Sequence, residues 1–456
     1  MKTLLALLVA LLLSGPAWAD TPTDGQPKAR QGTFALTNAR IVTVTNGTIE
    51  RGTLVVQNDR IVALGADVQV PAGAEVIDCD GHTIYPGMID AGTQLGLIEI
   101  GSVPETRDLD ELGDLTPHVH ALTAINPNSV LIPVTRVSGV TTVLTMPNGG
   151  LVPGQGALIN LHGYTPMQMQ AGPEVMMLQF PTTGRRGWWD RRSDDDIEKE
   201  AKRALETLNA AWDRAELYAS ITEAHANGQT EDRPEYVPAM QAMIPVVREE
   251  QTTIIRVNAA KDIVAAIDWV QERGLDNVVF SGVQEGWRVA DQIAAAGIPC
   301  IVGPVLATPT RASDRYDKPY ANAGLLKAAG VEIAIMSGEA ENVRNLPYNA
   351  GFAAAYGLGQ EAALEAVTMG AARILGIADQ QGSLEVGKKA TLFVADGDPF
   401  ETKTQVAHVF IDGYLIPMES RHTRLYNEFL ERDPGIAKHP EATDLPSGDG
   451  DGDGDD

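Results

Sequence analysis

The hydrophobic and polar positions along the chain fall into three successive patterns, and the first is a pattern of short strands. Between residues 33 and 85, short apolar runs alternate with turn residues, as at 53–57 and 60–64. The pair Asn58 and Asp59 between these two runs is typical of a tight turn. This segment is therefore predicted to form antiparallel β-hairpins.

The middle of the chain changes to strands that alternate with helices. Ser193 precedes three aspartates, which predicts the N-terminus of a long helix, and 262–273 has apolar residues at helical spacing. The expected strands lie near Ile89 and at 141–145, 157–161, 175–180, 252–257, 277–280, 299–302 and 331–336. This α/β alternation predicts a closed, parallel (β/α)8 barrel of the TIM type with helices outside.

Strands return after residue 382, at 390–395 and 406–411. We expect them to join the N-terminal hairpins in a composite β-sandwich domain formed by N- and C-terminal segments. The predicted domains are a signal peptide (1–19), a flexible leader (20–32), the first part of the sandwich (33–85), the barrel (86–382), the second part of the sandwich (383–420) and a C-terminal extension with an acidic tail (421–456).

The first residues have the pattern of a secretory signal. Lys2 precedes an apolar run, and Ala17-Trp18-Ala19 is typical of a cleavage site. The run is too short for a membrane span, which needs about 20 apolar residues. We predict a periplasmic or secreted protein that is cleaved after Ala19.

The charge balance narrows the classes of partner. The 456 residues include 61 acidic and 35 basic side chains, and the net charge is -26. Binding to nucleic acid or to an anionic membrane requires clustered cations, so both are disfavoured. The Asp/Gly repeat after Ser447 lacks the closing glutamate of a calcium loop, so we expect a solvated tail rather than a calcium site.

Two motifs carry a family resemblance. Residues 79–90 (CDGHTIYPGMID) and 382–390 (GSLEVGKKA) resemble the entry to and the exit from the barrel in the amidohydrolase superfamily, in its imidazolonepropionase-like and prolidase-like branch. Residues 368–376 resemble the last barrel helix of that family. The resemblance implies the barrel and the sandwich, zinc or a similar divalent metal, and hydrolysis of amide-like or cyclic C–N bonds by metal-bound hydroxide.

The resemblance also implies where the metal ligands would stand. Active relatives have His-x-His on strand one, a histidine on strands five and six, and an aspartate on strand eight. At those positions this chain has Gly92, Gln94, Asn258, Ser281 and Gly338. Glycine has no ligand atom, and the neutral side chains of the others bind metal weakly. We predict no metal site and no cofactor, and a pseudoenzyme or binding subunit.

Charged residues at the predicted barrel mouth are candidate catalytic residues. They are Asp90, Arg256, Glu285 and Glu339. Two carboxylates at one mouth can act as general acid and base, and Arg256 opposite Asp90 could replace the positive charge of the metal. The alternative for each is a structural ion pair or a charge on the rim.

The candidate ligand-binding residues form two groups. Gln94, Asn258 and Ser281 lie at strand ends, and Arg185, Arg186, Trp188 and Trp189 follow the predicted strand four. Arginine and tryptophan together can hold an anionic or aromatic ligand. The alternative is that the tryptophans anchor an insertion and that the arginines pair with the aspartates at 194–196.

A displaced metal site has one candidate, the pair His118 and His120. The two imidazoles could share an ion only in an extended segment, and no third ligand has a suitable spacing.

Taken together, these patterns lead us to expect a protein that binds a small molecule at the barrel mouth, or that partners a metal-competent paralogue or a second copy of itself. The alternative is an active C–N hydrolase that uses the carboxylates and Arg256 or a relocated metal.

Overall fold

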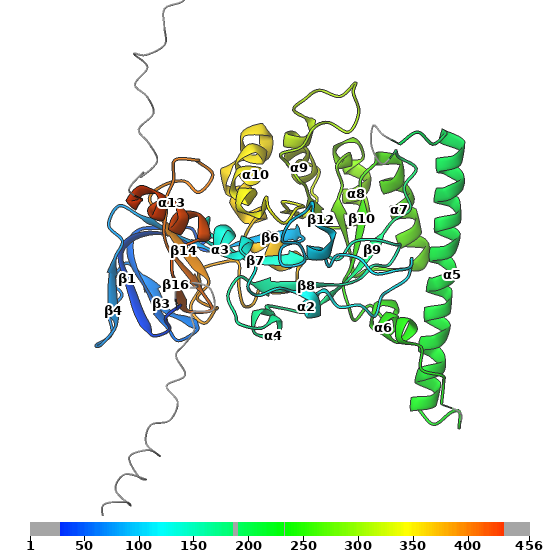
Figure 1. The fold of residues 1–456 in the computed structure, drawn as a ribbon, viewed down its shortest axis with the longest axis horizontal. Helices are drawn as coiled ribbons and strands as arrows, with labels where there is room; N and C mark the ends of the chain where they lie inside the picture. The colour runs from blue at the N-terminus through cyan, green and yellow to red at the C-terminus, as the bar shows by residue number, and fades with distance from the viewer. Residues whose placement is uncertain (1–27, 186–189, 232, 433–456) are drawn as a thin grey trace, which may run out of the picture.

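The computed structural model describes residues 28–185, 190–231 and 233–432, which form a β domain and a barrel (Figure 1). The β domain joins both ends of the described chain, and the barrel lies between them in sequence. On the side of the barrel away from the β domain stands a long helix, α5 (Asp194–Ala226).

The β domain is one eight-stranded sheet in the order β16-β15-β14-β5-β1-β2-β3, with β4 paired to β1. Its strands are β1 (Thr33–Val42), β2 (Thr48–Gln57), β3 (Arg60–Gly65), β4 (Glu75–Asp78), β5 (Thr83–Pro86), β14 (Leu392–Ala395), β15 (Val406–Ile411) and β16 (Tyr414–Ile416). Strands β14 and β5 pair antiparallel, with Val394 opposite Ile84. The prediction that both ends of the chain build one β domain is confirmed.

This sheet curls around its own apolar core. Phe34 on β1 and Phe410 on β15 are separated by two intervening strands in the sheet order, yet their rings lie 5.3 Å apart. The turn before β16 also approaches the β2–β3 turn, because a Cβ on Gly413 would lie 1.7 Å from the carbonyl oxygen of Asn58. Gly413 has φ of 76°, so both its conformation and its surroundings require glycine.

The barrel sheet has the order β13-β12-β11-β10-β9-β8-β7-β6. Its strands are β6 (Met88–Thr93), β7 (Val140–Thr145), β8 (Gly154–Asn160), β9 (Val175–Gln179), β10 (Thr253–Val257), β11 (Val278–Gly282), β12 (Cys300–Val302) and β13 (Ile333–Ile335). Each of the eight predicted strands is present. The ends of the sheet meet where the Gly338 N–H donates to the Gly92 carbonyl over 2.9 Å.

One strand corrects the prediction of a parallel barrel. Strand β8 runs antiparallel to both β7 and β9. The connection from β7 to β8 covers only residues 146–153. A parallel crossover needs a dozen or more residues, so this short connection can only reverse the chain.

The two faces of the barrel sheet pack differently. Ile255, Phe280 and Val302 pack with helix residues such as Ile263 and Leu326 on the outside. The alternate residues form a separate interior cluster, which includes Ile89, Leu144, Met146, Leu158, Met177, Ile254, Val279, Ile301, Ala334 and Met336. The barrel interior is thus a packed apolar core.

Helices cover the outside of the barrel. Besides α5, they are α2 (Ala121–Ala124), α3 (Leu131–Arg136), α4 (Pro166–Met169), α6 (Pro238–Val247), α7 (Ala260–Arg273), α8 (Ala290–Ala296), α9 (Lys318–Ala328), α10 (Leu346–Ala353), α11 (Gln360–Ala366) and α12 (Met369–Ile374); α13 (Arg421–Glu431) follows the β domain. Ser193 caps α5 as predicted, because its hydroxyl accepts from the Asp196 N–H. Trp212 of α5 packs edge-on against Trp269 of α7 at 5.1 Å.

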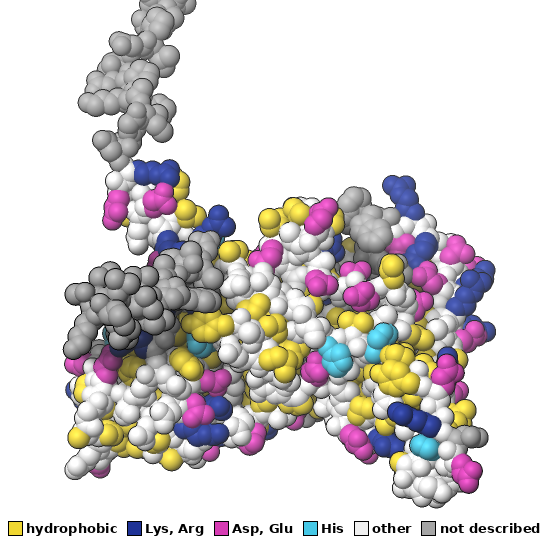
Figure 2. All heavy atoms as spheres, turned by 60° about the horizontal axis from the view of Figure 1, so that its bottom comes forward, with side chains coloured by type: hydrophobic (Ala, Val, Ile, Leu, Met, Phe, Trp, Pro, Cys, Tyr) yellow, Lys and Arg dark blue, Asp and Glu magenta, His cyan; other side chains and the backbone are white. Residues whose placement is uncertain are grey.

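The surface bears charges of both signs. The face in Figure 2 shows Lys and Arg in small groups beside Asp and Glu.

Of the helices within the described ranges, none combines the length and the apolar character needed to cross a membrane. Cys79 and Cys300 are both buried free thiols.

Candidate functional site

The barrel mouth is centred on Gly92, at the end of β6. Gly92 is buried, and a Cβ there would lie 2.6 Å from Cε of Met146 and 2.8 Å from Sδ of Met336. These two methionines follow β7 and β13 and belong to the interior cluster. Any side chain at residue 92, a histidine included, would have to displace both of them.

The other positions that the resemblance assigns to metal ligands lie at or near the ends of β6, β10, β11 and β13. Ser281 is buried, and its hydroxyl donates to Sδ of Met336 over 3.7 Å. Gln94 is half-buried and Asn258 is exposed. Asn258 lies against Gly282, because a Cβ built on Gly282 would be 2.3 Å from Oδ1 of Asn258.

These residues do not fit the divalent metal that the resemblance implies. Zinc takes imidazole, thiolate or carboxylate ligands, and a thioether suits softer ions. Gly338, the fifth position, contributes a backbone N–H, which cannot ligate a cation. Elsewhere within the described residues, no group of three or more His, Cys, Asp or Glu could hold a metal.

Asp90 lies at the seam where the barrel closes. Its Oδ1 accepts from the N–H groups of Gly92 and Ser337, each over 3.0 Å, and its Oδ2 is buried without a partner among the described residues. Burial raises the pKa of Asp90 to about 7, although these hydrogen bonds favour the ionised form. The carboxyl is fully buried, so it joins the first strand to the last and does not face a ligand.

Arg256 at the end of β10 has a different set of partners. Its Nη1 donates to Oδ1 of Asn148 over 3.3 Å, and the same oxygen accepts from Nε2 of Gln179 over 2.8 Å. Burial lowers the pKa of the guanidinium. The expected ion pair between Arg256 and Asp90 is therefore not formed, because each residue faces different atoms.

Glu285 is bound on all sides. Arg311 donates to both of its oxygens, over 2.5 and 2.6 Å, and Thr310 and the Ala260 N–H donate over 2.8 and 2.9 Å. The Arg311 contacts and the other hydrogen bonds lower the pKa of Glu285 against the effect of desolvation. A carboxylate with this many donors fastens the loop after β12 to the end of β11, and it is poorly suited to proton transfer.

Glu339 lies at the exposed rim. Its carboxylate accepts from Nδ2 of Asn342 over 2.5 Å, whereas its backbone carbonyl accepts from the Thr93 hydroxyl over 2.8 Å. The structure therefore does not bring the four candidate catalytic residues into one cluster: Asp90 is at the seam, Arg256 in the barrel, Glu285 under a loop and Glu339 in solvent.

The predicted basic and aromatic patch is only partly described. Arg185 forms an ion pair with Asp194 and donates to the carbonyls of Asp190 and Arg192. Arg185 therefore forms the ion pair with a helix aspartate that was the alternative to a ligand-binding role. Arg186, Trp188 and Trp189 lie outside the described residues.

Of the two neighbouring histidines, one lies beside an acidic side chain. Nδ1 of His120 lies 3.0 Å from Oε2 of Glu174, which the sequence spacing did not suggest. His118 is exposed, and both histidines line a hollow with Glu174 on the side of the barrel near α6. Among the described residues no third ligand joins His120 and Glu174, so the pair alone does not make a metal site.

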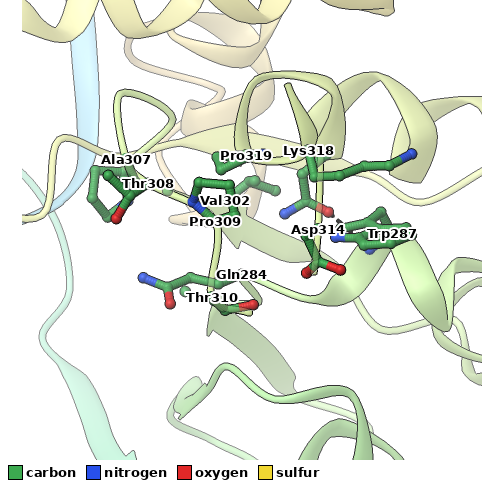
Figure 3. Close-up of a pocket in the computed structure, with 14 residues that line it drawn as sticks. Gln284, Trp287, Val302, Ala307, Thr308, Pro309, Thr310, Asp314, Lys318 and Pro319 are labelled. Atoms are coloured by element: carbon green, nitrogen blue, oxygen red, sulfur yellow. Dashed lines mark hydrogen bonds between the residues drawn. The ribbon is translucent and has the colours of Figure 1, made fainter. Parts of the chain in front are cut away.

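Two hollows open at the ends of the barrel strands. One lies between the loops after β11 and β12, around Trp287 (Figure 3). Arg288 and Lys318 lie over the Trp287 ring at 4.1 and 4.5 Å. The other hollow is larger, and its wall includes Asn148 and Gln179.

Sequence reasoning missed three residues at this mouth. Met146 and Met336 pack over Gly92, and Asn148 connects Arg256 to Gln179. Met146 directly follows the predicted strand 141–145, Asn148 lies three residues beyond it, and Met336 ends the predicted strand 331–336. Their placement at strand ends was the available signal.

Comparisons with known proteins agree with this geometry. The sequence profile of the Amidohydrolase family matches residues 138–416. An imidazolonepropionase from Mesorhizobium japonicum is 34% identical over 80 residues, which are 16% of this chain and 20% of that protein, so the match spans about a fifth of that relative.

Solved structures extend the similarity to most of the chain. A crystal structure of an amidohydrolase from Thermotoga maritima aligns with a TM-score of 0.75 and 26% identity, over 84% of this chain and 99% of that one. Molinate hydrolase aligns with a TM-score of 0.53 and 17% identity, over 93% of this chain and 99% of that one, and shows the same fold. Because the profile covers more than half of the sequence and the barrel geometry agrees, the chain belongs to the amidohydrolase family.

Proposed function

We propose that this chain is a ligand-binding member of the amidohydrolase family that does not carry out metal-dependent hydrolysis. The observation that supports it most is the packing at Gly92, where Met146 and Met336 occupy the space of the first ligand side chain. The remaining ligand positions also lack a strong metal ligand and so support the proposal. They are Gln94, Asn258, Ser281 and Gly338.

The chemistry of the remaining residues also favours binding. A metal lowers the pKa of a bound water from 15.7 to about 7, and another group would have to activate water in its place. Asp90 is buried away from ligands, and both oxygens of Glu285 are bonded to donors. Neither group is placed to take a proton from a water at the mouth.

The pair His120 and Glu174 favours a second candidate function, hydrolysis at a relocated metal. This candidate needs a third ligand, which a substrate or a partner subunit would have to supply. We rank it below the binding function because His120 lies at the wall of the barrel, away from the strand ends at which barrel active sites form.

We further propose export and a protein partner. The signal-like residues before Asp20 support a periplasmic or secreted location, and the mature chain is expected to begin at Asp20. A metal-competent paralogue or a second copy of the chain is the proposed partner. The similarity to imidazolonepropionase supports the imidazolonepropionase-like branch. Mass spectrometry of the protein isolated from its native compartment tests the cleavage site.

Thermal unfolding with and without chelator tests the binding function. A metal bound to the folded state stabilises it, so its removal lowers the midpoint. We expect the same midpoint with EDTA, with excess zinc and with neither. A midpoint that falls by several degrees in EDTA and recovers with zinc would sink the proposal. If the variant His118→Gln/His120→Gln abolishes that response, the metal is at the relocated site.

A further inference from the structure

Arg256 is a cation without an anion. It is half-buried at the end of β10, and its hydrogen-bond partner among the described residues is the neutral Oδ1 of Asn148, at 3.3 Å. The ion pairs within the described ranges include no contact of Arg256 with any carboxylate within 4.0 Å. This is unexpected in a chain with 61 acidic and 35 basic residues.

Burial of such a group is costly. A charge withdrawn from water requires a partner of opposite sign or a full set of hydrogen bonds. Guanidinium has five N–H donors, and one of them is used here. The nitrogens without a partner, Nε and Nη2, are not among the buried unpartnered atoms of the described residues, so water or a bound anion can reach them.

Two neighbours of Arg256, though not Arg256 itself, line the large hollow at the barrel mouth. Asn148 and Gln179 line the large hollow at the mouth, and Asn148 turns its Oδ1 toward both Gln179 and Arg256. The Nδ2 donor of Asn148 therefore points away from these two partners. Leu151 and Phe180 supply an apolar part of the same wall.

We infer that Arg256 binds the carboxylate of a small organic acid whose apolar body lies against Leu151 and Phe180. This inference rests on the proposed binding function and names its ligand class. Guanidinium and carboxylate match as planar forks, and their hydrogen bonds are charge-assisted.

The charge of the hollow favours a monoanion over phosphate. Its lining has two acids, Asp114 and Glu200, and two arginines, Arg192 and Arg203. These four charges balance, so one negative charge neutralises Arg256. A dianion would leave one charge in excess.

Calorimetric titration with benzoate tests this inference on the full mature chain. Benzamide is the matched neutral probe, and inorganic phosphate is the dianion. The variants are Arg256→Gln, which removes the charge, Arg256→Lys, which keeps the charge and loses the fork, and the control Arg214→Gln on the exposed side of α5. Unfolding midpoints verify that each variant folds.

We expect the wild type to bind benzoate at least about tenfold more tightly than benzamide or phosphate. Arg256→Gln should lose that preference, Arg256→Lys should retain part of it, and Arg214→Gln should match the wild type. No benzoate binding by the wild type, equal affinity for benzoate and benzamide, tighter binding of phosphate, or unchanged binding by Arg256→Gln would each overturn the inference. If Arg256→Gln does not fold, the benzamide comparison and Arg256→Lys still decide.

The metal content of the same samples separates the two proposals. Bound metal together with Arg256-dependent benzoate binding would overturn the proposed function and leave the carboxylate site standing. Metal-free protein that does not bind benzoate would overturn the carboxylate site alone.

Discussion

Gly92 is the residue on which the mouth of this barrel depends. In its place any larger side chain meets Met146 and Met336, which fill the interior from two other strands. The glycine at this strand end is thus coupled to the packing of two residues far away in sequence. Introducing a histidine at residue 92 alone would overpack the core and would not by itself create a metal site.

Gly92→Ala is predicted to destabilise the fold by about 1–3 kcal/mol because its Cβ overpacks the interior. Met336→Ala should relieve the clash, so the double variant is expected to be more stable than the sum of the two single effects. Urea unfolding measures all three variants. Gly32→Ala is the control, since its Cβ would meet nothing closer than 3.7 Å. Additive effects of the two substitutions would contradict this packing.

The buried carboxyl of Asp90 makes the stability of the fold depend on pH. Its folded pKa of about 7 lies above its ordinary value of 3.8, so the folded state binds more protons between these limits. Stability from this group is therefore present at low pH and is lost as pH rises from about 4 to 7. Asp90→Asn keeps the Oδ1 acceptor and removes the charge.

The free energy of unfolding of Asp90→Asn relative to the wild type should increase by about 2–4 kcal/mol between pH 4.5 and pH 8. Urea unfolding at the two pH values measures it. Parallel pH profiles for the wild type and the variant would show that Asp90 does not titrate in this range.

At the scale of elements, the loop after β12 is fastened by one carboxylate. Glu285 follows β11 and is bound in a bidentate pair to Arg311, 26 residues away. The same loop forms the wall of the smaller hollow around Trp287 (Figure 3). This contact makes Glu285 a structural residue of the mouth.

Glu285→Gln should weaken the loop and cost about 1–2 kcal/mol, because Arg311 is half exposed and can return to water. Limited proteolysis is expected to cut between residues 305 and 317 sooner than in the wild type. Glu339→Gln, at the exposed rim, is the control and should change stability by less than about 0.5 kcal/mol. Equal cleavage rates for Glu285→Gln and the control would rule out the fastening role.

The barrel strands and the strands on either side of Asn58 could be predicted because each has its own apolar run. The eight barrel strands and the hairpins near Asn58 were found in this way. The direction of β8 was not predicted, since an apolar run is the same in either direction and only the short connection after Thr145 reveals the reversal. The partners of Asp90, Arg256 and Glu285 were also out of reach, because they come from segments distant in sequence.

At the scale of the whole molecule, the reversed strand connects the barrel to the β domain. Asn160 at the end of β8 donates to Asp412 over 2.7 Å, and His162 just beyond it packs against Tyr414 with ring centroids 4.8 Å apart. A parallel β8 would place its end at the opposite rim of the barrel. The reversal therefore joins the two domains.

This interface is predicted to weaken in acid. Burial and the nearby charge of Arg136 lower the pKa of His162 to about 4, against an ordinary 6.5. The unfolded chain then binds a proton that the folded chain does not, so stability falls as pH drops from about 6.5 to 4. The partial exposure of His162 limits the loss to about 1–2 kcal/mol.

His162→Phe keeps a ring against Tyr414 and removes the proton site. The free energy of unfolding of the wild type should fall relative to that of this variant by this amount between pH 7 and pH 4.5. Calorimetry at the two pH values checks it, and a constant difference between the two proteins would contradict the assignment.

We propose that the packing of Met146 and Met336 at Gly92 takes the place of the metal centre that the family resemblance implies. The most direct test is the metal content of the purified mature chain, measured by plasma mass spectrometry after growth with zinc, manganese and iron. We expect well under one equivalent of any of these metals per chain. One tightly held equivalent, retained through dialysis against a chelator, would contradict it.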